Sequence, residues 1–157
     1  MTAEELADFP VVTSIDVAWG DLDAMGHVNN ARFFRYFESA RINYFAALGI
    51  SDITVTPGAG PILAETGCRF RRPLGFPDRI EVGARVSEIG EDRFRMSYRI
   101  VSTAQQDVVA EGFGVVVSYD YNLARKTALP RALREGILAT EGGEVPAMLP
   151  RVDRSAG

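Results

Sequence analysis

The chain has 157 residues, a formal net charge of −4, and 46% hydrophobic and 24% charged residues, which suits one globular domain and argues against nucleic acid as a main partner. No apolar run approaches the roughly 18 residues that span a bilayer, and the first ten residues lack the apolar segment of a signal peptide, so we expect no membrane partner. The single Cys68 excludes an internal disulfide and a cysteine-built zinc site, and it favours a cytoplasmic location.

Residues 1–10 are expected to be a frayed lead-in, and hydrophobic alternation predicts a strand over 11–19. A turn rich in Gly, Asp and Asn follows. The longest helical pattern then runs over 30–48, with Asn29 or Asn30 as its N-cap and Gly49 at its end. At ~1.5 Å per residue this helix is about 28 Å long.

The predicted helix carries a wide apolar arc, which indicates cover on more than one side. Its central stripe consists of Phe33, Phe37, Ala40, Tyr44 and Leu48. Arg41 interrupts the arc. Either it extends to the helix edge, or it forms a buried ion pair with Glu38, three positions earlier.

Beyond a loop over 49–60, which is either a pocket rim or a plain connection, alternation predicts four strands joined by short turns. These strands cover 61–73, 79–89, 93–103 and 108–121. In the first, Ile62, Ala64, Thr66, Cys68 and Phe70 are expected on one face. In the last, one face is small (Ala110, Gly112, Gly114, Val116, Ser118), as a helix lying against it would require.

A short helix over 130–140 and a loose tail over 141–157 complete the prediction, which makes residues 11–140 a single domain. The fold class is α+β, with one long helix on a curled five-stranded antiparallel sheet. Such a sheet has edge strands that dimerisation would cover.

The turn before the long helix holds most of the chemically active polar residues. Asp21 and Asp23 would point the same way in an extended segment. A metal pair is one interpretation, but no third ligand is evident, so no metal or cofactor is expected. Another interpretation is that both are turn residues. The third is a carboxylate beside a helix N-terminus, whose amides polarise a carbonyl, as an acyl-transfer site needs.

His27 is the only histidine, and no G-x-S-x-G motif accompanies it, so serine-hydrolase chemistry has no support. It is either a hydrogen-bonded turn residue or a catalytic one. Asn29 and Asn30 are first of all helix caps, and Asn29 has a second possible role in orienting water or a carbonyl. Arg69, Arg71, Arg85, Arg93, Arg95 and Arg99 form faces that are either solvated or able to hold the phosphates of a large anionic ligand.

The run W-x-D-x-D-x-x-G-H-V-N-N, followed by R-F-F-R-Y-F-E-S-A-R, resembles the hotdog-fold thioesterases of the 4-hydroxybenzoyl-CoA thioesterase family. The GHVNN variant is also similar to acyl-ACP thioesterases. The match is strong over residues 11–48 and extends to about 121 in the order of elements. It implies a sheet wrapped around one long central helix, a homodimer or homotetramer, and active sites at the subunit interface.

Carried over position by position, the resemblance implies that Asp23 is the catalytic carboxylate and that the amide of Asn30 binds the thioester oxygen. Asn29 and His27 would position water or the acyl group. Glu38 and Arg41 match a structural pair on the helix. The expected substrate is an acyl-CoA or acyl-ACP.

Gly26, Gly60, Arg71 and Arg93 are the predicted substrate contacts. The family usually has apolar or aromatic residues after the glycine, where this chain has His-Val-Asn-Asn, so the acyl group and the role of Asp23 as nucleophile or base stay open. The alternatives are a non-catalytic acyl-thioester-binding domain and a hotdog hydratase or dehydratase using His27.

Overall fold

Six antiparallel strands form one sheet in the computed structural model, which describes residues 2–49 and 58–149. The strands are β1 (Val11–Asp16), β2 (Ala59–Phe70), β3 (Arg79–Ile89), β4 (Arg93–Ser102), β5 (Asp107–Asp120) and β6 (Arg125–Lys126). Their order is β1-β3-β4-β5-β2, and β6 pairs with β5. The expected antiparallel sheet is confirmed, but it has six strands and not the expected five. The sixth is β6, whose two residues are too few to show a pattern in the sequence.

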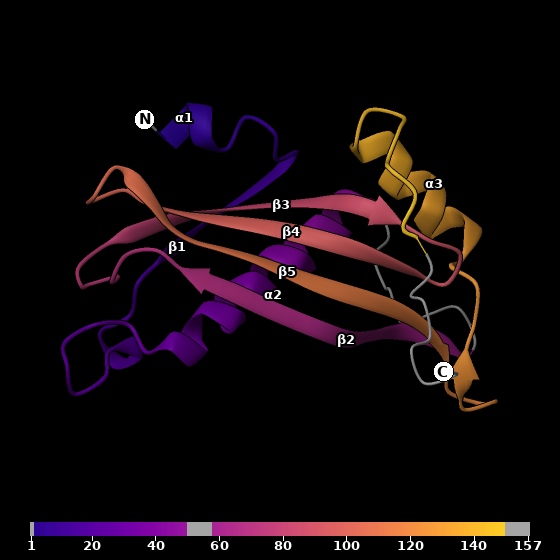
Figure 1. Cartoon of the computed structure of the whole chain (residues 1–157), viewed down its shortest axis with the longest axis horizontal. Helices are drawn as coiled ribbons and strands as arrows, with labels where there is room; N and C mark the ends of the chain where they lie inside the picture. The colour runs from indigo at the N-terminus through magenta and orange to yellow at the C-terminus, as the bar shows by residue number, and fades with distance from the viewer. Residues whose placement is uncertain (1, 50–57, 150–157) are drawn as a thin grey trace, which may run out of the picture.

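The long helix α2 (Asn30–Ala47) lies in the N-terminal third of the chain and packs against one face of the sheet (Figure 1). The small face of β5 makes this approach possible. A Cβ added at Gly112 would lie 2.4 Å from two ring carbons of Phe37. The core therefore sits between α2 and the sheet, and Phe33, Phe37, Ala40 and Tyr44 are buried there as the stripe predicted.

The predicted ion pair between Glu38 and Arg41 is wrong. Glu38 instead pairs with Arg35, with 2.7 Å between Oε1 and Nη1. Arg41 donates from Nη1 to the buried Tyr98 hydroxyl at 3.1 Å, and the Tyr98 ring stacks on Phe37. Burial raises the pKa of Tyr98, so its hydroxyl stays protonated. A lone pair of its oxygen accepts the hydrogen bond from Arg41.

A bulge in β2 breaks the alternation expected over 61–73. The register shifts between Leu63 and Glu65, so Ala64 has no partner across the strand. Leu63 therefore pairs with the core residue Val116 and lies on the same face as Thr66 and Cys68, where only even-numbered residues were expected.

The opposite face of the sheet is partly covered by Leu6 and Phe9, which follow α1 (Thr2–Glu5). Leu6 and Phe9 are buried with Val101 of β4. Phe9 also lies over Gly83 of β3, where an added Cβ would come within 2.6 Å of its ring.

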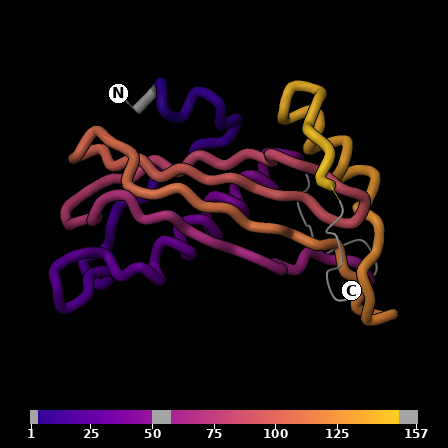
Figure 2. Tube along the Cα trace, viewed as in Figure 1, coloured from indigo at the N-terminus to yellow at the C-terminus, as the bar shows by residue number. Residues whose placement is uncertain are grey.

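The short helix α3 (Arg131–Thr140) lies at the other end of the sheet from the β1–α2 loop (Figure 2). Glu141, at its end, accepts hydrogen bonds from the Tyr44 hydroxyl at 2.8 Å and the Val86 amide at 2.7 Å. Beyond it the Ile89 amide donates to the Pro146 carbonyl at 3.0 Å. Residues 150–157 of the expected tail and 50–57 of the expected pocket rim lie outside the described residues. Within the described part, none of the helices has the length and apolar character needed to cross a membrane.

Candidate active site

The turn between β1 and α2 is closed by its own backbone. A bridge joins Leu22 to Val28, and the Asp23 amide donates to the His27 carbonyl at 2.8 Å. The Gly26 amide donates to the Asp23 carbonyl at 3.0 Å, and Gly26 has a φ of +79°, which favours glycine. Gly26, a predicted substrate contact, therefore shapes the turn that presents its neighbours.

The start of α2 is capped by Asn29, whose side-chain oxygen accepts the Ala31 amide at 2.9 Å. The next residue, Asn30, is the first of the helix, and its amide donates to no residue in the described part of the chain. An unpaired amide at the positive end of a helix is the donor that a developing oxyanion needs.

A cavity of about 420 Å³ opens at this junction and brings together Asp23, His27, Asn30 and Arg71. Asn29 is not among its lining residues, because its side chain is used in the cap. Three of the four predicted catalytic residues and one of the four predicted substrate contacts thus share one cavity.

The Asp23 carboxylate is exposed and only partly engaged. Its Oδ1 accepts the Met25 amide at 2.9 Å, which fixes the orientation of the carboxylate. Its Oδ2 has no hydrogen bond from any described residue. One oxygen is held and the other is available to a ligand or a water molecule.

Asp21 does not point the same way as Asp23, contrary to the extended-segment expectation. The 3-10 turn η1 (Trp19–Asp21) rotates the chain just before Leu22. The Asp21 carboxylate instead accepts the Ala18 amide at 3.1 Å and the hydroxyl of the buried Tyr36 at 3.0 Å. The two acids therefore have separate environments.

The rest of the cavity wall comes from residues that sequence reasoning missed. Phe33 and Phe70 meet edge to face with their ring centroids 5.0 Å apart. The Val28 amide donates to the Leu74 carbonyl at 2.8 Å, which fixes the segment after β2 against the turn. The remaining wall residues are Met25, Arg72 and Pro73. Because these contacts join segments that are about 40 residues apart along the chain, no local sequence pattern reveals them.

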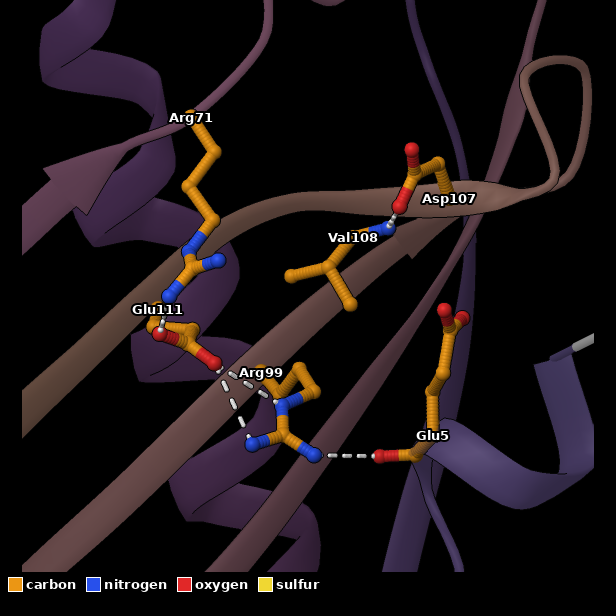
Figure 3. Close-up of polar contacts among 6 residues, drawn as sticks. All are labelled: Glu5, Arg71, Arg99, Asp107, Val108 and Glu111. Carbon is orange, nitrogen blue, oxygen red and sulfur yellow. Dashed lines mark hydrogen bonds and ion pairs between the residues drawn. The ribbon is translucent and has the colours of Figure 1, made fainter.

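Arg71 sits at the cavity wall with its guanidinium anchored on one side (Figure 3). Its Nη2 lies 2.9 Å from Oε2 of Glu111, whose Oε1 holds Arg99 at 3.1 Å. Arg99 in turn donates to the Glu5 carbonyl at 2.7 Å. Arg71 is thus held by a carboxylate that is itself fixed, and its guanidinium has no second acceptor among the residues that the structure describes.

Two of the predicted substrate contacts, Gly60 and Arg93, do not line this cavity. Gly60 lines a second, mostly apolar cavity of about 90 Å³ between the end of α2 and the start of α3. Arg93 donates to both oxygens of Asp92 at 2.8 and 3.2 Å, which lowers the pKa of that carboxyl.

Cys68 packs beside the core, and burial raises its pKa to about 11, as suits a packing residue.

Within residues 2–49 and 58–149, no three His, Cys, Asp or Glu side chains are grouped as metal ligands.

Comparison with known proteins places these features in a family. The model of the thioesterase-like superfamily matches residues 17–137. A chloroplastic acyl-acyl carrier protein thioesterase of Arabidopsis thaliana is 29% identical over 115 residues, which are 73% of this chain and 60% of that protein. A 1,4-dihydroxy-2-naphthoyl-CoA hydrolase of Synechococcus elongatus is 26% identical over 127 residues, which are 79% of this chain and 92% of that protein. This chain therefore spans less than two thirds of the plant relative's length.

Among solved structures, a Thermus thermophilus thioesterase complexed with coenzyme A and zinc superposes with a TM-score of 0.76. It is 35% identical, and the match covers 86% of this chain and 96% of that one.

Proposed function

The chain belongs to the thioesterase-like superfamily, and from the cavity at the start of α2 we propose that it hydrolyses an acyl-CoA or acyl-ACP thioester to a free acid and a thiol. Membership confirms the resemblance to hotdog-fold thioesterases and the expectation of a thioesterase. The observation that carries the substrate and mechanism is that Asp23 and Asn30 line the same cavity, and that the Asn30 amide has no partner among the described residues.

Asp23 has the geometry of a nucleophile or of a general base. As a nucleophile, its free oxygen attacks the thioester carbonyl, the C–S bond breaks, and the thiolate leaves and takes a proton from solvent water. Water then hydrolyses the resulting mixed anhydride and restores the carboxylate. As a base, the same oxygen takes a proton from water while that water attacks the carbonyl. The C–S bond then breaks, and the proton passes from Asp23 to the leaving thiolate, which gives the free acid and the thiol. The Met25 amide on Oδ1 holds the carboxylate in place for either route.

The Asn30 amide is the proposed oxyanion donor. The carbonyl oxygen gains negative charge in the tetrahedral intermediate, and the amide and the positive end of α2 stabilise that charge. His27, which lines the same cavity, is proposed to position water or the acyl group. Asn29 acts indirectly, because its cap fixes the first turn of the helix.

The acyl group is proposed to rest against Phe33 and Phe70, which form the apolar wall beside Asp23. Arg71 is proposed to bind the phosphate of the phosphopantetheine arm. Both CoA and acyl carrier protein carry this arm. Arginine suits this role because its planar guanidinium can bind a phosphate while one nitrogen remains on Glu111.

A homodimer is proposed to complete the site. β2 lies at the sheet edge and is 12 residues long, and its Leu63 and Phe70 are 43% and 41% exposed. Antiparallel pairing of two β2 strands would place the start of one beside the end of the other. Gly60 of a second copy would then lie near Phe70 and Arg71. Arg93 would reach a carrier only from a further copy, as in a homotetramer.

Thiol release from a panel of straight-chain and aromatic acyl-CoAs tests the proposal. Asp23→Asn should abolish release, because the amide neither attacks nor accepts a proton. Asp16→Asn is the matched control, since Asp16 lies on β1 with a side chain that is 82% exposed. A fully active Asp23→Asn protein would refute the mechanism. CoA-ester binding without turnover in the unaltered protein would favour a binding domain, and enoyl hydration without thiol release would favour a hydratase.

A further inference from the structure

Asp21 is the polar residue that joins the β1–α2 turn to the side of the long helix. Its Oδ2 accepts the Tyr36 hydroxyl at 3.0 Å and the Ala18 amide at 3.1 Å. Its Oδ1 lies 3.6 Å from Nε of Arg32, on the same helix. Its backbone carbonyl accepts the Asn29 amide at 2.9 Å. A single residue therefore contacts the turn, the cap and the helix side.

The Tyr36 hydroxyl is buried in the core. The residue is 4% exposed and belongs to the main core cluster. Burial and the hydrogen bond to Asp21 raise the pKa of Tyr36, so the hydroxyl keeps its proton and donates. A buried hydroxyl beside a half-buried carboxylate is favourable only when the two are paired. The pair therefore holds one geometry.

The two groups of the proposed reaction, Asp23 and the Asn30 amide, lie in sequence between the two members of this pair. Asp23 is two residues beyond Asp21, and Asn30 directly follows Asn29, whose amide Asp21 holds. Between Asp23 and Asn30, the turn is closed by the hydrogen bond that the Asp23 amide donates to the His27 carbonyl at 2.8 Å. The distance from the Asp23 carboxylate to the Asn30 amide is thus set by Asp21 on one side and the closed turn on the other.

We propose that Asp21 and Tyr36 are positioning residues that hold the Asp23 carboxylate in register with the N-terminal amide of α2. This inference rests on the proposed thioester hydrolysis. The pair does not touch the substrate, because neither residue lines the cavity. It acts by limiting movement of the turn, since a shift of about 1 Å in a reacting group can lower the rate by about a hundredfold.

Tyr36→Phe tests the inference with the loss of one oxygen atom. With the acyl-CoA of the panel that the unaltered protein hydrolyses fastest, kcat should fall 10- to 100-fold while KM changes less than threefold. The matched control is Tyr44→Phe, on the same helix. Its buried hydroxyl also donates to a carboxylate, Oε1 of Glu141 at 2.8 Å, but far from the cavity. Tyr44→Phe should lower Tm and leave kcat within twofold.

Changes at Asp21 separate positioning from general destabilisation. Asp21→Asn keeps an oxygen that accepts the Tyr36 hydroxyl, so it should retain more kcat than Asp21→Ala. The double variant Asp21→Ala/Tyr36→Phe should be no slower than Asp21→Ala, because both changes remove the same contact. The inference would be overturned if the kcat losses of the two single variants multiplied in the double variant. It would also be overturned if Tyr36→Phe had unaltered kcat, or if Tyr44→Phe lost as much kcat as Tyr36→Phe.

The outcomes distinguish this inference from the proposed function. If the unaltered protein releases thiol, Asp23→Asn does not, and Tyr36→Phe keeps full kcat, hydrolysis stands and positioning by Asp21 and Tyr36 is wrong. If the unaltered protein releases no thiol from any acyl-CoA or acyl-ACP, both are overturned.

Discussion

Gly112→Ala is the substitution that most directly tests how α2 lies on the sheet. The added methyl group would lie 2.4 Å from the Cε2 and Cζ atoms of Phe37, and 3.0 Å from the Gly67 carbonyl oxygen. Carbon atoms make favourable contact at about 3.5–4.0 Å, so the ring must move by more than about 1 Å. Phe37 cannot move freely, because it is 1% exposed and stacks on Tyr98 with 4.9 Å between ring centroids.

The magnitude follows from opposing effects. Overpacking a filled core costs about 1–3 kcal/mol. Replacing glycine within a strand by alanine recovers about 0.5–1 kcal/mol of backbone entropy. Gly112→Ala should therefore lower the free energy of unfolding by up to about 2.5 kcal/mol, with about 1 kcal/mol as the central value. For a chain of this size, each 1 kcal/mol corresponds to about 2–4 °C in Tm.

The assay is thermal and urea unfolding at a fixed protein concentration, with Gly114→Ala as the matched control. Gly114 lies on the same strand and face, but its added methyl group would meet the flexible Cδ1 of Leu63 at 3.2 Å. This variant should be as stable as the unaltered protein or slightly more so. Phe37→Leu should recover part of the loss when combined with Gly112→Ala. If Gly112→Ala were as stable as Gly114→Ala, the derived packing of α2 on β5 would be wrong.

Three further outcomes are expected. Gly83→Ala should release the N-terminal segment to limited proteolysis, because its methyl group would lie 2.6 Å from the Phe9 ring; a segment equally protected in both proteins would contradict this. Cys68, with its pKa raised by burial to about 11, should react with iodoacetamide at pH 8 about two orders of magnitude more slowly in the folded than in the urea-unfolded chain; equal rates would refute the burial. Arg93 lowers the pKa of Asp92, so the carboxylate stabilises the fold above about pH 4 and loses that effect as pH falls further. Asp92→Asn should therefore be less stable at pH 7, and acid titration of unfolding should show the difference shrinking below about pH 4.

Strands β1 to β5 and the long helix α2 were predictable because each has a strong hydrophobic period and a clear end. The helix over 30–48 ends one residue later than α2, and the strand over 79–89 matches β3. The bulge at Ala64 was not predictable, since its residues suit either face and only the pairing of β2 with β5 selects one. The pairing of β6 was equally hidden, because two residues carry no period.

The candidate site divides along the same line. A turn crowded with polar residues before a capped helix is a local feature, so the sequence sufficed to locate the turn, and the family resemblance singled out Asp23 and Asn30 within it. The apolar wall was missed because Phe70 reaches Phe33 only through tertiary packing. The different surroundings of Asp21 and Asp23 were missed for the same reason, since a hydroxyl 15 residues away orients Asp21.

Arg41 shows why local rules fail in a buried environment. Glu38 has an arginine three positions before it and another three positions after it, so helical spacing allows either pair. Arg35 is the more exposed and takes the carboxylate at 2.7 Å, where both charges stay largely hydrated. Arg41 faces the sheet, and there the Tyr98 hydroxyl, 57 residues away in the chain, accepts it at 3.1 Å. The choice follows from desolvation, because a half-buried guanidinium needs an acceptor within its own surroundings, and only the folded sheet supplies one.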